Sequence, residues 1–134
     1  MAPTDPFALV VDDDAFILME ACDILEKAGF RCHQAMDYRE AVEVLERHHA
    51  AVTLLFSDVD LGGGENGFAV ARHVDEHWPH IVIVIASGHV LPNCGDMPAR
   101  ATFIPKPFSQ RIVHEHLAKT LPDDKKPEPL KRAI

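Results

Sequence analysis

Val10-Val11-Asp12-Asp13-Asp14 is the stretch that decides the fold expected for this 134-residue chain. It joins the end of an apolar run, Phe7–Val11, to three consecutive acidic residues. A continuous apolar run of this length is typical of a strand that is buried on both faces. The acidic residues are therefore expected at the carboxyl end of a buried strand.

The rest of the chain repeats this alternation of apolar runs and amphipathic segments. Further strands are expected at residues 31–35, 52–56, 81–86 and 102–104. Helices are expected at residues 15–28, after a cap at Asp37, at residues 66–77, and from a cap at Ser109 to about Thr120. Strands that alternate with helices predict an α/β fold, with a parallel sheet covered by helices on both faces.

Two segments depart from this regular pattern. Between residues 91 and 100, three helix-breaking residues leave no room for a helix longer than about one turn, so the fourth helix is expected to be short or irregular. Residues 122–134 contain three prolines and almost no apolar residues. We therefore expect one domain over residues 1–121, followed by a flexible Pro-rich tail over residues 122–134.

Composition narrows the classes of function. A net charge of -8 argues against general binding to nucleic acid or to anionic membranes. The longest apolar run, residues 81–86, is too short to span a bilayer, and the N-terminus has no secretory pattern. The three cysteines, Cys22, Cys32 and Cys94, form no C-x-x-C pair, which indicates reduced thiols packed as small core residues in a cytoplasmic protein.

Reactive side chains follow four of the five expected strands. Asp12, Asp13 and Asp14 follow the first strand, and Ser57 and Asp58 follow the third. Ser87 follows the fourth strand, and Lys106 lies just after the fifth. The carboxyl ends of parallel strands meet at one edge of a sheet, where ligands bind. These groups are therefore expected to form one site.

The charges of that site predict its chemistry. Asp12, Asp13 and Asp58 would place like charges close together, and such a cluster either holds protons or binds a cation. Carboxylate oxygens with room for water suit Mg²⁺. A metal facing a carboxylate, with a hydroxyl group and an ammonium group nearby, suits a transferable phosphoryl group.

These motifs resemble the signature of response-regulator receiver domains of the CheY-like, single-domain type. The resemblance rests on residues 10–14, on Asp58 after an apolar strand, on Ser87-Gly88 and on Lys106-Pro107-Phe108, and it covers about residues 6–120. It implies a flavodoxin-like, doubly wound, five-stranded parallel sheet with strand order 2-1-3-4-5. It also implies a cis peptide bond between Lys106 and Pro107.

The same resemblance implies a role for each site residue. Asp58 would be the phosphoacceptor, and Ser87 and Lys106 would hold the phosphoryl oxygens. Asp13 would bind Mg²⁺ directly, Asp12 through water, Asp58 as a further ligand and Asp60 through its backbone carbonyl. Phe103 would be an aromatic switch residue that acts with Ser87. The side chains of Asp60 and His89 would tune the lifetime of the phosphoryl bond.

The implied function is that of a two-component phosphoacceptor switch, with slow self-hydrolysis, rather than an enzyme. A sensor histidine kinase or a histidine phosphotransfer protein would supply the phosphoryl group from a phosphohistidine. Only the Pro-rich tail follows the last expected helix, so we expect a complete chain of this kind to be a stand-alone cytoplasmic regulator; a receiver excised from a hybrid kinase is the alternative. A stand-alone regulator would contact a downstream protein target or pass the phosphoryl group on in a phosphorelay.

Alternative interpretations stay open at this point. Asp58-Val59-Asp60-Leu61 also resembles the D-x-D motif of haloacid-dehalogenase-type phosphohydrolases, although that family carries the motif on its first strand. A receiver-shaped binding module that needs no phosphate is a third possibility. The glycines at residues 62–64 lack the ending of a P-loop and indicate a flexible loop. His73 and His77, at helical i, i+4 spacing, indicate a solvated face rather than a metal site.

Overall fold

Five parallel strands form one sheet in the order β2-β1-β3-β4-β5. The structure is a computed structural model that describes residues 5–62, 64–88, 92–93 and 95–133. The strands are β1 (Phe7–Val11), β2 (Arg31–Ala35), β3 (Val52–Asp58), β4 (Val82–Ser87) and β5 (Thr102–Pro105). The observed order confirms the doubly wound, flavodoxin-like sheet predicted from the sequence.

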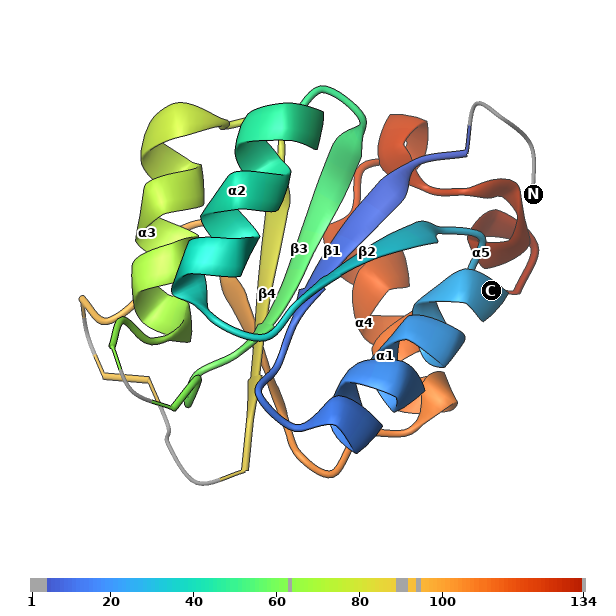
Figure 1. Ribbon diagram of the computed structural model, residues 1–134. Coiled ribbons are helices and arrows are strands. Elements are labelled where there is room, and N and C mark those ends of the chain that lie inside the picture. Colours follow the sequence, from blue (N-terminus) through green and yellow to red (C-terminus); the bar gives the residue numbers. More distant parts are fainter. Residues whose placement is uncertain (1–4, 63, 89–91, 94, 134) are drawn as a thin grey trace.

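Helices cover both faces of this sheet. They are α1 (Ala15–Lys27), α2 (Tyr38–His48), α3 (Gly67–His77), α4 (Gln110–Thr120) and α5 (Glu128–Ala133), with a short 3-10 helix, η1 (Asp123–Lys125), before α5. Figure 1 shows α2 and α3 on one face and α1, α4 and α5 on the other. None of the helices in the described part of the chain combines the length and the apolar character that crossing a bilayer requires.

Alternation along the strands divides the core into two layers. In β1, Ala8 and Val10 pack toward α1 and α4, whereas Leu9 and Val11 pack toward α2 and α3. Both sets are almost completely buried, which is why the run contains no polar residue. The chain can therefore become polar only beyond the strand end, and this places Asp12 at the edge of the sheet.

Side-chain caps fix where the helices begin. The carboxylate of Asp14 accepts hydrogen bonds from the amides of Phe16 and Ile17, so Asp14 is the N-cap of α1. The other N-caps are Asp37 for α2, Asn66 for α3 and Ser109 for α4. The predicted caps at Asp37 and Ser109 are thus confirmed.

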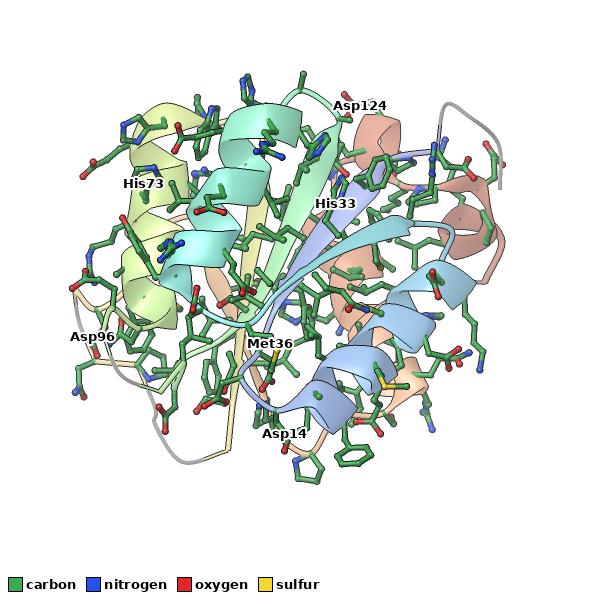
Figure 2. The ribbon with its side chains drawn as sticks, viewed as in Figure 1. Asp14, His33, Met36, His73, Asp96 and Asp124 are labelled. Carbon is green, nitrogen blue, oxygen red and sulfur yellow. The ribbon has the colours of Figure 1, made fainter. Side chains whose placement is uncertain are left out.

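The segment between β4 and β5 contains no helix among its described residues, 88, 92–93 and 95–101, and residues 95–97 and 99–100 form turns and bends. Its position is fixed by contacts to α3, beside which Figure 2 shows Asp96. The Nη1 atom of Arg72 donates to the carbonyl oxygen of Asp96 at 2.7 Å, and Arg100 pairs with Asp75 at 2.6 Å. This agrees with the expectation of a short or irregular fourth helix, although Leu91 and Cys94 lie outside the described residues.

The C-terminal segment differs from the flexible tail expected from its composition. Residues 123–125 and 128–133 form η1 and α5, and the side chain of Leu130 is fully buried in the core layer beneath α1. Gly29, in the turn after α1, has a φ angle of +105°. It lies so close to this segment that a Cβ atom added there would be 2.6 Å from Cβ of Pro127. Buried Leu130 and Pro127, together with a hydrogen bond from Lys125 to the carbonyl oxygen of His80, therefore hold this segment against the domain.

Candidate functional site

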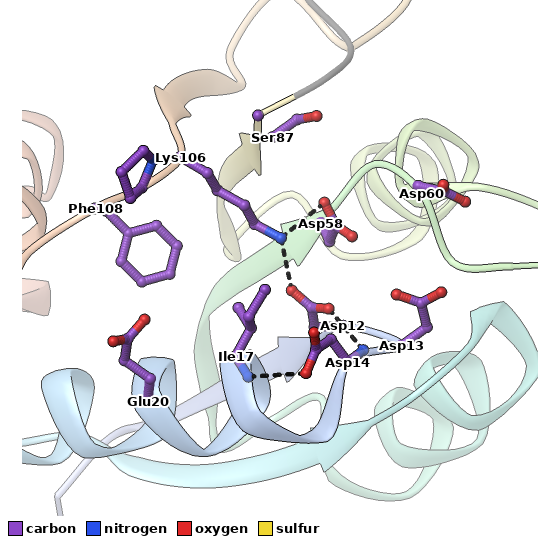
Figure 3. A pocket seen from close by; sticks show the side chains of 12 residues that line it. Asp12, Asp13, Asp14, Ile17, Glu20, Asp58, Asp60, Ser87, Lys106 and Phe108 are labelled. Atoms are coloured by element: carbon purple, nitrogen blue, oxygen red, sulfur yellow. Dashed lines mark hydrogen bonds and ion pairs between the residues drawn. The ribbon is translucent and has the colours of Figure 1, made fainter.

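A cleft of about 550 Å³ opens at the carboxyl edge of the sheet, between the beginnings of the flanking helices. Figure 3 shows acidic side chains on one side of it and Lys106 reaching in from the other. It is lined by Asp12, Asp13, Asp14, Ile17, Glu20, Asp58, Asp60, Ser87, Gly88, Lys106, Pro107 and Phe108. The groups expected at separate strand ends therefore share one cavity.

Three aspartates converge within this cleft. Asp12 follows β1 and is 4% exposed, Asp13 is exposed, and Asp58 is the buried last residue of β3. Each offers a carboxylate oxygen, and the three oxygens lie within 4.8 Å of one another. Hard oxygen donors at this spacing, one of them open to solvent, fit a cation that keeps several of its waters, as Mg²⁺ does.

Lys106 supplies the positive charge of the site. Its Nζ atom lies 2.9 Å from Oδ2 of Asp12 and 3.2 Å from Oδ1 of Asp58 (Figure 3). The residue follows β5 directly, where its amide donates to the carbonyl oxygen of Ser87 and its peptide bond to Pro107 is cis. The expected cis bond is thus confirmed, and the ammonium group bridges the ends of β1 and β3.

Burial and charge shift the ionisation of this group of residues. Burial raises the pKa of Asp58 above its ordinary value of 3.8; Lys106 opposes this shift and Asp12 adds to it. Burial alone would favour the neutral amine of Lys106, but the hydrogen bond and charge of Asp12, followed by Asp58, raise its pKa. The charged Lys106 therefore lies beside Asp58, whose ionisation is made unfavourable by burial. A cation bound next to Asp58 would favour its ionised form.

The backbone at Asp58 is held by a close contact that does not stand out in the sequence. The amide of Gly67 donates to the carbonyl oxygen of Val59 at 2.7 Å, and a Cβ atom at Gly67 would lie only 1.8 Å from the carbonyl oxygen of Asp58. Only glycine allows the start of α3 to approach the end of β3 this closely. The position of Asp58 thus depends on the residue that follows the Asn66 cap.

The remaining predicted residues lie at different distances from the cluster. Ser87 is 4% exposed and lines the cleft at the end of β4. Asp60 also lines the cleft, but its carboxylate is outside the aspartate cluster and accepts a hydrogen bond from the amide of Gly62. Phe103 packs on the α3 side of the sheet, away from the cleft lining. His89 lies outside the described residues.

Three further residues complete the cleft. Ile17 and Glu20 line it from α1. Phe108 lines it from the segment before α4, and its ring packs edge-to-face on that of Phe56 with centroids 5.4 Å apart. The spacing of Ile17 and Glu20 puts them on one helix face just beyond the Asp14 cap. That spacing is the only feature of the sequence that could have indicated them.

The other patterns do not form a second metal or phosphate site in the described part of the chain. The rings of His73 and His77 stack with centroids 4.2 Å apart, and Nδ1 of His77 lies 2.9 Å from the carbonyl oxygen of His73. Among the described residues, the only group of three or more potential metal ligands is the aspartate cluster. Gly62 and Gly64 have φ angles of +79° and +91°, which serve the turn after Asp60.

Comparison with known proteins identifies the family. The family model of the response regulator receiver domain matches residues 8–118. The sensor kinase CckA of Brucella abortus (strain 2308) is 30% identical over 104 residues, which are 75% of this chain but only 11% of that kinase. The chain thus spans about a tenth of the length of this relative.

Solved receiver structures share the fold. A response regulator receiver protein from Sinorhizobium medicae WSM419 superposes with a TM-score of 0.79 at 25% identity, covering 87% of this chain and 94% of that one. The receiver domain of NtrX from Brucella abortus gives a TM-score of 0.69 at 28% identity, covering 84% and 97%. Accepting a phosphoryl group is the role of this family. With the expected fold and acidic cleft both present, the chain belongs to the response regulator receiver domain family of two-component systems.

Proposed function

We propose that this receiver domain accepts a phosphoryl group on Asp58 from a phosphohistidine, in a reaction that depends on Mg²⁺. One observation carries the proposal: Asp12, Asp13 and Asp58 bring oxygens within 4.8 Å of one another while Lys106 contacts both Asp12 and Asp58. Such a site combines a nucleophile, cation ligands and a fixed positive charge.

The residues of the cluster would hold the metal. Asp13, Asp58 and the backbone carbonyl of Asp60 would bind Mg²⁺ directly, and Asp12 would bind it through water. When bound there, the ion would supply positive charge that offsets negative charge on the phosphoryl oxygens.

The protein groups perform the transfer itself. A carboxylate oxygen of Asp58 attacks phosphorus in line, the phosphorus–nitrogen bond breaks, and the histidine leaves with its electron pair and takes up a proton. Lys106 and the hydroxyl of Ser87 donate hydrogen bonds to the phosphoryl oxygens. Water later hydrolyses the acyl phosphate slowly, so the protein is a switch with self-phosphotransfer and slow autodephosphorylation rather than a turnover enzyme.

The conformational response to phosphorylation would pass from Ser87 in the cleft to Phe103 in β5. Movement of Ser87 toward the phosphoryl group would free space at the end of β4. Phe103, which pairs with Ile85 in the β4–β5 register and is only partly buried, could turn into that space. Its changed exposure would then bias contact with a downstream protein target or transfer to a further relay partner. Such a role fits a cytoplasmic protein.

The partner that supplies the phosphoryl group is proposed to dock beside the cleft through α1 and α4. Phe16, Met19 and Ile112 are 82%, 64% and 46% exposed, which is unusual for large apolar side chains, and all three lie near the beginnings of these adjacent helices. A helix of a histidine kinase or phosphotransfer domain could cover them while presenting its phosphohistidine to Asp58. We expect Phe16→Ser to slow transfer from such a domain and to leave labelling by acetyl phosphate intact. Equal loss with both donors would contradict this docking site.

The central experiment compares Asp58→Asn with Asp60→Asn. The wild-type protein is incubated with acetyl phosphate and Mg²⁺ and is expected to gain the mass of one acid-labile phosphoryl group. Asp58→Asn is expected to lose this label completely, because an amide is not a nucleophile here. Asp60→Asn is expected to keep the label and to change only its lifetime, because its carboxylate is outside the cluster.

The same pair of variants separates the competing functions. A phosphohydrolase of the haloacid-dehalogenase type would need Asp60 as acid and base, so Asp60→Asn would remove its rapid turnover of phosphomonoesters. Persistent labelling of Asp58→Asn would refute the proposed acceptor. Failure of the wild-type protein to bind Mg²⁺ at millimolar concentration would favour a binding module that needs no phosphate.

A further inference from the structure

Two cysteine side chains meet between α1 and β2, away from the acidic cleft. Cys22 is on the buried face of α1 and Cys32 is in β2. The Sγ atom of Cys32 donates to the carbonyl oxygen of Cys22 at 3.7 Å, and the interaction between the two side chains shifts the pKa of both thiols. The phosphoryl chemistry proposed above uses neither thiol, so their proximity needs a separate explanation.

The surroundings make the two thiols unequal. The side-chain amide of Gln34 donates a hydrogen bond to Sγ of Cys22 at 3.2 Å, which stabilises a negative charge on that sulfur. The hydrogen bond with Cys32, and then that with Gln34, lower the pKa of Cys22 in spite of burial. The same contact with Cys22, together with burial, raises the pKa of Cys32. Because the thiolate is the nucleophilic form, the contact from Gln34 favours Cys22 over Cys32 as the attacking thiol.

The pair is close to solvent although it is packed against the core. β2 is an edge strand of the sheet, Gln34 is exposed and Cys32 is partly buried. Cys22 retains 5% exposure. Hydrogen peroxide is small enough to need only a narrow opening beside the partly exposed Cys32.

We propose that Cys22 and Cys32 form a reversible intramolecular disulfide when the protein meets hydrogen peroxide. The thiolate of Cys22 attacks a peroxide oxygen, the oxygen–oxygen bond breaks, hydroxide leaves and a sulfenic acid remains. The thiol of Cys32 then attacks the Cys22 sulfur, a sulfur–sulfur bond forms and water is released. The peroxide takes up the two electrons that the thiols lose, and a dithiol reductant reverses the bond.

The bridge would tie α1 to the edge of the sheet. α1 begins at the Asp14 cap and carries Ile17 and Glu20 into the acidic cleft, so the modification would restrain the helix that forms one side of that cleft. This inference does not depend on phosphorylation of Asp58, and the two can be tested separately.

The test uses a Cys94→Ser protein, in which Cys22 and Cys32 are the only thiols. The protein is exposed to hydrogen peroxide, quenched, denatured, alkylated with N-ethylmaleimide and weighed by mass spectrometry. The expected product is a monomer that has lost two hydrogens and carries no alkyl group, whereas the reduced protein carries two. Dithiothreitol is expected to restore both, and proteolytic mapping is expected to join the peptides of Cys22 and Cys32.

Two variants test the assigned roles. Cys32→Ser is expected to stop at a sulfenic acid on Cys22 that dimedone traps, and Gln34→Leu is expected to slow disulfide formation. The proposal is overturned if both thiols stay open to alkylation after peroxide treatment. It is also overturned if Cys22 goes on to sulfinic acid without a link, or if the disulfides join separate chains.

Discussion

At the scale of single residues, Asp58 combines its proposed role as phosphoacceptor with a cost in stability. Its pKa is raised by burial, so the folded protein holds a proton more tightly than the unfolded chain. By linkage, the stability that comes from this proton is complete below the ordinary value of 3.8 and is lost as pH rises through the higher folded value. Ionised Asp58 therefore destabilises the metal-free protein at neutral pH.

Asp58→Asn should remove this cost. In EDTA at pH 7 we expect the variant to be more stable than the wild type by about 0.5–2 kcal/mol, a range common for stabilising substitutions. The gain should shrink as the pH approaches 3.8, and urea unfolding at several pH values measures it. Asp60→Asn, an exposed matched control, should stay within about 0.5 kcal/mol of the wild type. A variant that is less stable than the wild type at pH 7 would refute the cost assigned to Asp58.

At the scale of elements, the sequence predicts contacts that follow from strand order and misses contacts that do not. Asp12, Asp58 and Lys106 each adjoin an apolar run, and the ends of parallel strands meet by geometry, so their convergence is predictable. The approach of Gly67 to Asp58 and the burial of Leu130 depend on packing between distant segments. No local pattern encodes such packing, and the composition of the C-terminal segment therefore predicts a flexible tail.

The docking of α5 makes its own prediction. Leu130 is fully buried and belongs to the core layer beneath α1, so Leu130→Ala should lower the free energy of unfolding by about 2–4 kcal/mol. Lys131→Ala, on the exposed side of the same helix, should change it by no more than about 0.5 kcal/mol. Urea titration of both variants measures the difference. Equal stability of the two would mean that α5 is not docked in solution.

At the scale of the whole molecule, cation binding should stabilise the entire domain, because the proposed ligands come from two neighbouring strands of one sheet. A ligand that binds only the folded state adds about 1.4 kcal/mol when its concentration is ten times the dissociation constant. We therefore expect Mg²⁺ to raise the melting temperature of the wild type. Asp13→Asn should abolish most of this gain, because Asp13 is the exposed member of the cluster and a direct ligand in the proposed site.

The net charge of -8 provides an alternative cause that the measurement must separate from site binding. Any salt screens repulsion among the acidic side chains and can stabilise the fold without occupying the cleft. Sodium chloride at the ionic strength of the magnesium buffer supplies the control, since it screens equally but is a poor ligand for the aspartates. A site-specific effect requires a larger shift with Mg²⁺ than with Na⁺ in the wild type, and nearly equal shifts in Asp13→Asn. If Mg²⁺ and Na⁺ raise the melting temperature of the wild type equally, the aspartates only repel one another and bind no metal. The proposed role of the metal in phosphoryl transfer would then be refuted.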